Sequence, residues 1–342
     1  MNEQHTGFVY VQTNDAELNE VVVYRRGADG RLDRLGSYLT GGKGSGRPHL
    51  PSQASVVLAQ GRLFVTNAGS DDLTVFAVDG DILVAHDRVV SGGSTPTSVA
   101  VHGSWVYVLN SQGEANVAGF SLDGGGVAPL PDSIRPLGGD SDPAQAAFSP
   151  DGRTLVVTDR AANSIHAFAV GADGLLAQHA AHPSAGMTPY GFAFAPDGTL
   201  VVTEAAGAQV GKASASSYRL DGGRELVRVS AAVPNTRSEV CWALVGADGR
   251  IAFVTNFGDG TISSYELGPD GSIALRDAVA ATTVEGGPGI RDEAISSDGR
   301  FLYALHADAR KVFAWEVGKD GTLVAIGSAN GLPVTAAGLA AS

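Results

Sequence analysis

Residues 142–181, DPAQAAFSPDGRTLVVTDRAANSIHAFAVGADGLLAQHAA, contain four short segments with the character of β-strands. Gln145–Ser149 is apolar, and Thr154–Thr158 is dense in β-branched residues. Ile165–Val170 alternates apolar and polar residues, as a half-buried strand does. Asp-Gly pairs follow the first and third segments, and a polar fourth segment runs to about Ala181. We therefore predict a four-stranded antiparallel sheet.

The same pattern recurs along the whole chain. Asp-Gly pairs that follow an apolar run stand at Asp29, Asp79, Asp123, Asp173, Asp221, Asp270 and Asp320. Their spacings are 50, 44, 50, 48, 49 and 50 residues. A second set lies about 22 to 24 residues before four of these, at Asp151, Asp197, Asp248 and Asp298. Asp-Gly is favoured in type I′ hairpins, where both central residues need positive φ, so each unit is predicted to contain two hairpins.

Four antiparallel strands repeated every 45–50 residues are typical of the blades of a β-propeller. The chain begins in what resembles a second strand, Phe8–Val11, and Thr335–Ser342 resembles a first strand. Counting from Asp320 to the end of the sequence, and on from its beginning to Asp29, gives 51 residues, one further period. We therefore predict one all-β domain over residues 1–342. It is a seven-bladed propeller closed by N- and C-terminal strands in one blade.

The composition restricts the partners. The 342 residues include 23 Lys+Arg and 36 Asp+Glu, a net charge of −13. This acidity argues against nucleic acid and against an anionic membrane surface as partners. No apolar run approaches a membrane span, and the first ten residues have no signal-peptide character. The lone Cys241 cannot form an intrachain disulfide. We expect a cytoplasmic monomer that takes a small-molecule ligand.

In a propeller blade the first strand lines the central channel, and here the Asp-Gly hairpins share one face. The opposite face, the channel mouth, collects the residues that begin strand one and end strand two, and there the units differ from one another. The beginnings of strand one supply the candidate residues Asp142, Gln145, Tyr190, Trp242, Arg291 and Asp292. The ends of strand two supply Asn67, Asn110, Asp159, Glu204, Phe257 and His306, and His49 lies in an insertion over this face.

Four of these residues are candidates for catalysis. The Arg291 guanidinium is suited to bind a carboxylate or an oxyanion of a substrate. The structural alternative is that it forms an ion pair with its own neighbours in the chain or with Asp142. Glu204 or Asp159 is the candidate general base, with His306 as a proton donor. We expect no required cofactor. A divalent cation at the mouth stays an open alternative, with carboxylate ligands from Asp142, Asp159, Glu204 and Asp292.

The other candidates are assigned to substrate binding, each with a structural alternative. Tyr190, Trp242 and Phe257 would form apolar walls, or they pack between adjacent blades. The three asparagines at strand-two ends contact substrate, or they cap strand ends through backbone hydrogen bonds. These are Asn67, Asn110 and Asn256.

Two units, Phe148-Ser-Pro-Asp-Gly-Arg-Thr-Leu-Val-Val-Thr-Asp159 and Ile295-Ser-Ser-Asp-Gly-Arg-Phe-Leu-Tyr303-Ala304, resemble the seven-bladed lactonase family. That family includes 6-phosphogluconolactonase of the propeller type and the fungal carboxymuconate-lactonising enzymes. The resemblance spans nearly the whole chain, including the start in mid-blade. It implies the propeller fold and a site of His, Arg and Glu side chains at the channel mouth.

The sequence departs from that site at several positions. The family usually has histidines where this chain has Asp142 and Ala144, and Arg-His at Tyr190-Gly191. Where the family has an Asn-Glu pair, this chain has Glu204-Ala205, and where the family has an Asn-Arg pair, this chain has Asn256-Phe257. Arg291-Asp292 matches the family's Arg-Asn well. Because a phosphate needs cationic partners, these losses argue against a phosphorylated lactone.

Three functions are open from the sequence. The first is hydrolysis of a small unphosphorylated lactone or cyclic ester, with Arg291 stabilising the developing negative charge. The second is the carboxymuconate cyclase type of reaction, in which the same groups close or isomerise an unsaturated acid. The third is a propeller without catalysis that binds a ligand or protein on its variable face.

Overall fold

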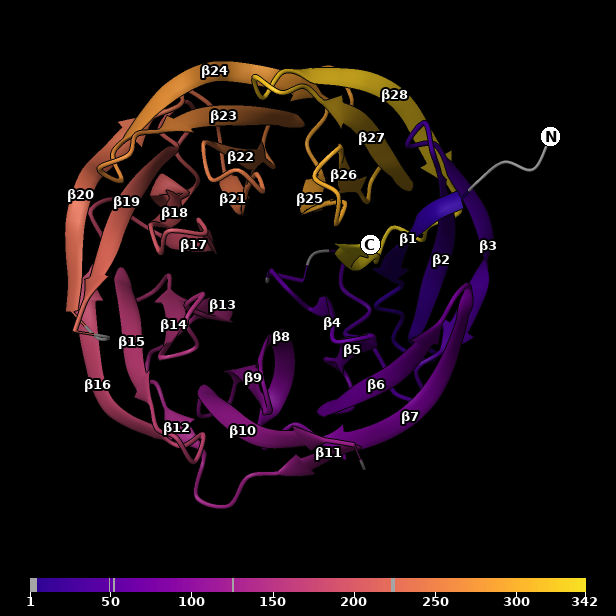
Figure 1. Ribbon diagram of the computed structural model, residues 1–342, viewed down its shortest axis with the longest axis vertical. Helices are drawn as coiled ribbons and strands as arrows, with labels where there is room; N and C mark the ends of the chain where they lie inside the picture. The colour runs from indigo at the N-terminus through magenta and orange to yellow at the C-terminus, as the bar shows by residue number, and fades with distance from the viewer. Residues whose placement is uncertain (1–4, 49, 52, 125, 223–224) are drawn as a thin grey trace.

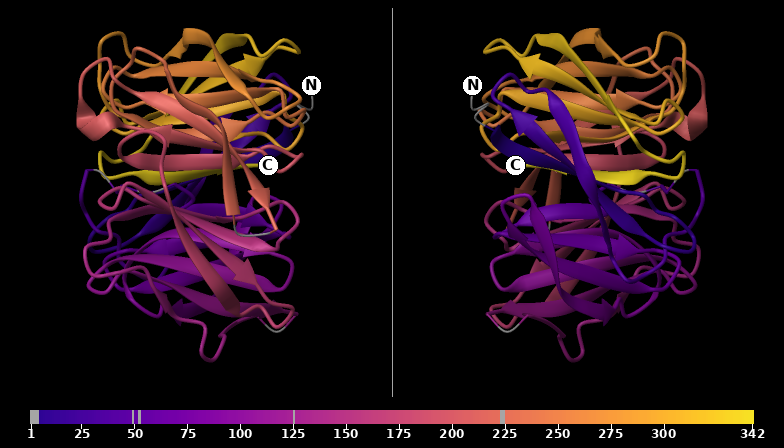
Figure 2. Two further views of the ribbon diagram at one scale, coloured as in Figure 1. Left: turned by 90° about the vertical axis from the view of Figure 1, so that its left-hand side faces the viewer. Right: turned by 90° about the vertical axis from the view of Figure 1, so that its right-hand side faces the viewer.

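The computed structural model describes residues 5–48, 50–51, 53–124, 126–222 and 225–342, which form seven antiparallel sheets arranged in a ring (Figure 1). Each sheet is one blade, and the axis of the ring is called the channel below. Figure 2 shows the ring edge-on, with strands crossing between its two faces and loops on both faces. The predicted seven-bladed propeller is confirmed.

Blades 2 to 4 follow one another with the innermost strand first. Blade 2 contains β4 (Val56–Ala59), β5 (Arg62–Asn67), β6 (Asp72–Asp79) and β7 (Ile82–Val90). Blade 3 contains β8 (Ser94–His102), β9 (Trp105–Gln112) and β10 (Asn116–Asp123), and its outer position is divided between β11 (Gly126–Pro129) and β12 (Arg135–Pro136). Blade 4 contains β13 (Pro143–Phe148), β14 (Thr154–Asp159), β15 (Ser164–Val170) and β16 (Leu176–Pro183).

Blades 5 to 7 repeat the arrangement. Blade 5 contains β17 (Pro189–Phe194), β18 (Leu200–Glu204), β19 (Ser214–Asp221) and β20 (Glu225–Pro234), with the short 3-10 helix η1 (Ala206–Ala208) after β18. Blade 6 contains β21 (Val240–Val245), β22 (Ile251–Asn256), β23 (Thr261–Leu267) and β24 (Ile273–Thr282). Blade 7 contains β25 (Ile290–Ile295), β26 (Phe301–His306), β27 (Lys311–Val317) and β28 (Leu323–Asn330).

Blade 1 closes the ring with strands from both ends of the chain. Its strands are β29 (Ala337–Ala341), β1 (His5–Gln12), β2 (Glu20–Gly27) and β3 (Leu32–Leu39), in the order β29-β1-β2-β3. β29 and β1 are antiparallel, with Val11 opposite Leu339 and Tyr10 opposite Ala340. The predicted closure is confirmed. It satisfies the backbone groups of both strands, which would otherwise form an open edge.

The Asp-Gly pairs lie in the hairpins as predicted, but the predicted type I′ turn is wrong. In the turn after β15, Gly174 has a φ of +80°, whereas Asp173 is not among the residues with positive φ. The Asp173 carboxylate instead accepts a hydrogen bond of 3.1 Å from the Leu175 backbone N–H. The loop is long enough for aspartate to organise the turn through its side chain, so positive φ is needed at the glycine alone.

The same glycines also allow neighbouring blades to approach closely. A Cβ at Gly174 would lie 2.4 Å from the Trp105 ring, and the Tyr107 hydroxyl donates a 2.8 Å hydrogen bond to the Gly174 carbonyl. Blades 7 and 1 repeat this contact. A Cβ at Gly30 would lie 2.4 Å from Phe301, and Tyr303 donates to the Gly30 carbonyl at 2.9 Å. The repeated glycine is therefore set by turn conformation and by packing between blades.

The core lies between adjacent blades rather than at one centre. One cluster joins Val9 and Tyr24 of blade 1 to Leu305 and Val312 of blade 7, and similar clusters fill other contacts between blades. Each blade therefore buries its two faces against its neighbours. No helix among the described residues has the length and apolar character required to cross a membrane.

We predict that Gly174→Ala and Gly30→Ala each lower the free energy of unfolding by about 2–4 kcal/mol, because a left-handed alanine is strained and its methyl group overlaps an aromatic ring. Gly198→Ala is the matched control. Gly198 has a φ of +87°, and a Cβ there would meet no atom of the described chain within 4 Å. Its expected loss is about 1–2 kcal/mol, from strain alone. Urea unfolding measures all three, and equal losses would refute the packing role.

Candidate functional site

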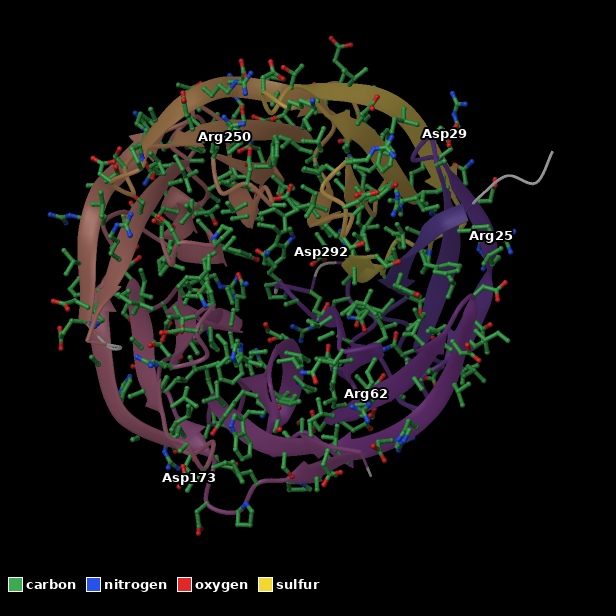
Figure 3. All side chains as sticks on the ribbon, viewed as in Figure 1. Arg25, Asp29, Arg62, Asp173, Arg250 and Asp292 are labelled. Carbon is green, nitrogen blue, oxygen red and sulfur yellow. The ribbon has the colours of Figure 1, made fainter. Side chains whose placement is uncertain are left out.

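The structure brings the predicted candidates to the face opposite the Asp-Gly hairpins. The candidates from strand one begin β13, β17, β21 and β25, and those from strand two end or follow β5, β9, β14, β18, β22 and β26. Asp292, labelled in Figure 3, lies near the centre of the ring. His49 lies outside the described residues. The two groups of candidates differ in how far their polar atoms are already hydrogen-bonded.

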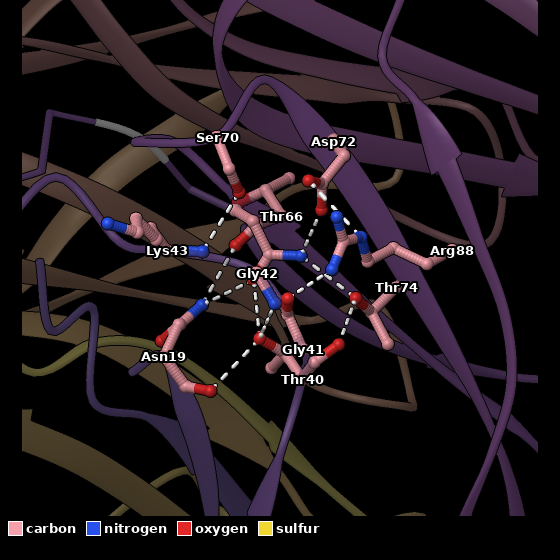
Figure 4. Close-up of polar contacts among 11 residues, drawn as sticks. Asn19, Thr40, Gly41, Gly42, Lys43, Thr66, Ser70, Asp72, Thr74 and Arg88 are labelled. Carbon is pink, nitrogen blue, oxygen red and sulfur yellow. Dashed lines mark hydrogen bonds and ion pairs between the residues drawn. The ribbon is translucent and has the colours of Figure 1, made fainter. Parts of the chain in front are cut away.

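The asparagines at the ends of strand two are bound into loops. The Asn67 amide donates to Asp72 at 2.6 Å and to Thr74 at 2.8 Å, and its oxygen accepts from Asn19 at 2.9 Å and Thr40 at 2.7 Å. Figure 4 shows how these partners from blades 1 and 2 converge. All four hydrogen bonds of the amide are therefore used within the fold, with side chains rather than with the backbone groups that the capping alternative predicted.

The other two asparagines have similar surroundings. Asn256 donates to Thr261 at 3.1 Å and Ser263 at 2.9 Å, and accepts from Asn235 at 2.8 Å. Asn110 donates to the Ser91 carbonyl and to Asn116, while its oxygen has no hydrogen-bond partner among the described residues. These side chains fasten the turn between strands two and three to the segment before it.

Glu204 occupies the same place in blade 5. Its carboxylate is fully buried and accepts hydrogen bonds from the hydroxyls of Ser214 at 2.7 Å and Ser216 at 2.5 Å. The Gly186 N–H at 2.8 Å and the Ser184 hydroxyl at 3.3 Å complete the set. Because four donors from this blade and the loop before it hold the carboxylate, taking up a proton would disrupt them.

Asp159 fastens the corresponding turn of blade 4. It accepts from the Ser141 hydroxyl at 2.6 Å and the backbone N–H groups of Asp142 and Ala161 at 3.1 Å, and His166 lies 3.5 Å away. Burial alone would raise the pKa of Asp159, but the hydrogen bonds from His166, Ser141 and the backbone lower it well below the usual value. The carboxylate is therefore a weak base.

His306 completes the set in blade 7. Its Nδ1 accepts the Ala309 N–H at 3.1 Å, and its Nε2 lies 3.4 Å from the Gly287 carbonyl. Accepting at one nitrogen and donating at the other requires the neutral imidazole. Burial also lowers the pKa of His306. Both ring nitrogens are thus engaged in the loop.

Arg291 is held more loosely. Its guanidinium donates to the carbonyls of Ala336 at 3.3 Å and Val334 at 3.5 Å, and lies 3.5 Å from the half-exposed Asp308 carboxylate. Its Nε is buried without a partner among the described residues. Burial lowers the pKa of Arg291, an effect that Asp308 and Asp292 oppose. The ion pair that the structure gives Arg291 is with Asp308, a partner not expected from the sequence, which predicted one with its chain neighbours or with Asp142.

Two buried carboxyl groups follow Arg291 on β25. Asp292 accepts the Gly338 N–H at 2.7 Å, and burial raises its pKa to about 7. Burial and the Asp292 charge raise the pKa of Glu293 well above its usual value. Neither Glu293 oxygen has a hydrogen-bond partner in the described part of the chain. No role was predicted for Glu293 from the sequence, because the sequence of so short a strand does not reveal that a charged side chain is buried.

The aromatic candidates pack between adjacent blades, as their structural alternative predicted, with Tyr190 5% and Trp242 0% exposed. This buried cluster is called the wall below. Tyr190 and Trp242 make an edge-to-face contact with ring centroids 5.0 Å apart, in a cluster with Ala144 and Cys241, and Phe257 packs against it. The Tyr190 hydroxyl and the Trp242 Nε1 are buried without partners among the described residues. Burial raises the pKa of the Cys241 thiol to about 12, so this residue is a buried apolar group rather than a nucleophile.

The remaining candidates lie beside this wall. Gln145 is bound to the backbone of Phe192 through both ends of its amide. Asp142 is half exposed and lies 2.5 Å from Arg160. The Arg160 guanidinium lies over the Tyr190 ring, 4.8 Å from its centroid, and is 15% exposed. Arg160 was not selected from the sequence. Its position directly after the strand-two end at Asp159 was the available signal.

A metal site is not evident in the described part of the chain, where no group of three or more His, Cys, Asp or Glu side chains is placed to hold an ion.

A cavity of about 590 Å³ lies elsewhere, between blades 2 and 3, lined by residues that include Val90, Phe120 and Ile134. It contains none of the candidate residues. The mouth therefore offers two arginines, partly exposed carboxylates and an aromatic wall.

Comparison with known proteins agrees with this fold. Residues 125–207 match the family described as lactonase, 7-bladed beta-propeller. This segment carries Asp142, Asp159, Arg160, Tyr190 and Glu204. No protein of curated function matches the chain in sequence.

Solved structures extend the likeness to the whole chain. A protein from Lactobacillus plantarum has a TM-score of 0.80 at 15% identity, covering 99% of this chain and 100% of its own. The periplasmic gluconolactonase PpgL of Pseudomonas aeruginosa has a TM-score of 0.74 at 19% identity, covering 96% of this chain and 97% of its own. At these identities the structures show the fold alone.

The chain is thus a seven-bladed β-propeller. The matched segment supports the resemblance to the lactonase propellers that the sequence predicted.

We predict that Asp292→Asn becomes more stable relative to the parent as pH rises from about 4 to 7. The unfolded carboxyl ionises near pH 3.8 and the folded one near 7, so the parent loses stability over this interval. Asparagine can still accept the Gly338 N–H but carries no charge. The relative gain is up to about 4 kcal/mol.

Urea unfolding at pH 4, 5, 6 and 7 measures this gain. Asp33→Asn, at an exposed position on β3, is the control. A difference between Asp292→Asn and the parent that stays constant with pH would contradict the prediction.

Proposed function

We propose that the protein hydrolyses a small unphosphorylated lactone or cyclic ester at the channel mouth. One observation carries the proposal: two arginines, Arg160 and Arg291, lie beside the wall of Tyr190, Cys241 and Trp242. Arg160 lies over the Tyr190 ring, 4.8 Å from its centroid, and Arg291 lies at the start of β25, which contacts the β21 strand that carries Trp242. The match to the lactonase family and the gluconolactonase among the similar structures support this reaction class.

The two arginines suit different parts of such a substrate. Arg160 is partly exposed, and its stacking on Tyr190 fixes the plane of the guanidinium. It exchanges Asp142 for a carboxylate or ring oxygen of the substrate. Arg291 is deeper, with 3% of its side chain exposed, contacts of 3.3–3.5 Å and an Nε that has no partner in the described part of the chain, so it can turn toward a new acceptor. It polarises the lactone carbonyl and stabilises the oxyanion.

Asp308 is the carboxylate best placed to act as general base. Glu204, Asp159 and His306 use their polar atoms to hold loops, whereas Asp308 is half exposed and lies 3.5 Å from Arg291. It takes a proton from water as the water oxygen attacks the carbonyl carbon, forming a tetrahedral oxyanion beside Arg291. The ring C–O bond then breaks, and the leaving alkoxide takes the proton from Asp308. The product is the open hydroxy acid.

The charge at the mouth suits an unphosphorylated substrate. Arg160 is paired with Asp142 and Arg291 with Asp308, so each cation is already balanced by a carboxylate. A phosphate dianion would have to displace both carboxylates and would meet a chain of net charge −13. A neutral lactone, or one with a single carboxylate, has no such requirement.

A second candidate is a propeller that binds its ligand without catalysis. The saturation of Glu204, Asp159 and His306 by hydrogen bonds favours it, because these are the groups from which acid–base chemistry was expected. The cyclase reaction on an unsaturated acid would use the same mouth in the opposite direction. NMR of the products on lactone and muconate-type panels separates the three functions.

We predict turnover of at least one unphosphorylated γ- or δ-lactone, and a fall in kcat/KM of about 10²–10³-fold for Arg291→Ala. Asp308→Asn should lower kcat by about 10²–10⁴-fold, because the general base is lost. Arg160→Ala should mainly raise KM. The control is Arg250→Ala, since Arg250 is exposed on the Asp-Gly face beside Asp248.

Hydrolysis is followed by pH-stat, with and without added Mg²⁺ or Mn²⁺. Unchanged kcat/KM in Arg291→Ala would refute the assignment of that residue. Saturable binding of a lactone without turnover would establish the binding function instead.

A further inference from the structure

Neighbouring blades are joined near the mouth by a repeated contact between side chain and backbone. The Gln145 amide of β13 donates to the Phe192 carbonyl of β17 at 3.0 Å and accepts the Phe192 N–H at 2.6 Å. Ser98 of β8 makes the same pair of contacts with Ala146 of β13, at 3.5 and 3.2 Å. We call this contact the clamp. It links the innermost strand of one blade to that of the next.

Blade 5 cannot form its clamp. Gln145 precedes Ala146, which lies opposite Val157, and Gly191 precedes Phe192, which lies opposite Val202. Gly191 is therefore the residue equivalent to Gln145, and it has no side chain. The backbone of blade 6 that it would bind is that of Ala243 on β21.

A residue from another part of the ring binds Ala243 instead. Gln53, which precedes β4 in blade 2, donates to the Ala243 carbonyl at 2.8 Å and accepts the Ala243 N–H at 3.1 Å. The two residues are 190 positions apart, in blades that are not adjacent. In Figure 1 the segment before β4 extends toward the centre of the ring. A Cβ at Gly191 would lie 2.5 Å from the Gln53 Oε1, 2.6 Å from the Cys241 carbonyl oxygen and 2.9 Å from the Trp242 Cα, so glycine there makes room for the amide and for the backbone of blade 6.

The segment that carries Gln53 is fixed from two further sides. Ala54 has a φ of +63°, a left-handed conformation that is unfavourable for a non-glycine residue. Its carbonyl accepts the Val99 N–H of blade 3 at 2.8 Å. The next residue, Ser55, accepts a 2.9 Å hydrogen bond from Gln12 of blade 1. Contacts with three other blades thus hold a strained segment in place and aim Gln53 across the channel.

We propose that Gln53 and Gly191 form a clasp across the channel that closes it directly below the mouth and positions the Tyr190–Trp242 wall. Gly191 follows Tyr190, and Ala243 follows Trp242, so the clasp lies about 3 Å inward of the wall at the rise of a β-strand. The mouth is then a blind cup with one opening. Gln53 is a positioning residue for the proposed function. Its use for a lactone rests on that function, while the clasp itself does not.

Local amide hydrogen exchange tests the clasp without requiring activity. In Gln53→Ala, exchange of β21 (Val240–Val245) should increase about tenfold or more, while β17 (Pro189–Phe194) is unchanged. Gln145→Ala is the matched control, since it removes a clamp between neighbours. It should show the reverse, with faster exchange in β17 and unchanged β21.

Gly191→Ala tests the role of the glycine. Its methyl group would overlap the Gln53 Oε1 and also the backbone of Cys241 and Trp242, so it should raise exchange in β21 as Gln53→Ala does. Gln53→Glu, which keeps the acceptor and loses the donor, provides a milder change and should give intermediate exchange.

For a lactone that the parent hydrolyses, Gln53→Ala should raise KM more than it lowers kcat, since the wall moves while Arg291 and Asp308 stay in place. Folded Gln53→Ala with parental exchange in β21 would overturn the proposal. If no lactone is turned over, the proposed function fails, and the exchange data still decide the clasp.

Discussion

Closure of the ring by β29 and β1 is the constraint on which the rest of the structure depends. Each blade buries its apolar faces against two neighbours, so no blade has a complete core of its own. An open ring would leave one apolar face and one strand edge uncovered at each end. Because the strands close in register, every contact between blades is fixed, including the approach of Gly30 to Phe301 that joins blade 1 to blade 7.

That constraint also explains how polar groups are distributed at the mouth. Strand two must end at a turn whose backbone groups lie inside the ring, and such groups need partners. Asp159 and Glu204 accept backbone N–H groups there, while Asn67 and Asn256 bind side chains of the turn, so residues that look chemically versatile in sequence serve the fold. The beginnings of strand one face the channel, and their candidate side chains other than Asp142 are also buried. Arg291 and Arg160 beside them keep the loose or exposed contacts from which a ligand site can be built.

The fold was predictable because the sequence pattern of strands and Asp-Gly turns repeats at a regular spacing. The Asp-Gly spacing established blade number and closure, although Asp173 forms its turn with its side chain and not with a positive φ. The same periodicity placed the candidate residues on the face opposite the Asp-Gly hairpins. What sequence patterns do not contain is pairing across the ring. Gln53 and Ala243 are 190 positions apart, and nothing near Gln53 in the chain indicates a partner in blade 6. Arg160 was missed because its importance comes from stacking on Tyr190 in the next blade.

Unsatisfied polar atoms separate the structural part of the mouth from the part suited to a ligand. At the ends of strand two nearly every buried polar atom has a partner. At the beginnings of strand one in blades 5 to 7, the Tyr190 hydroxyl, the Trp242 Nε1, the Arg291 Nε and both Glu293 oxygens have none among the described residues. A buried polar group left unpaired costs about 1–3 kcal/mol. The first three groups donate, and the Glu293 oxygens accept or, when protonated, also donate, so partners of both kinds would relieve that cost.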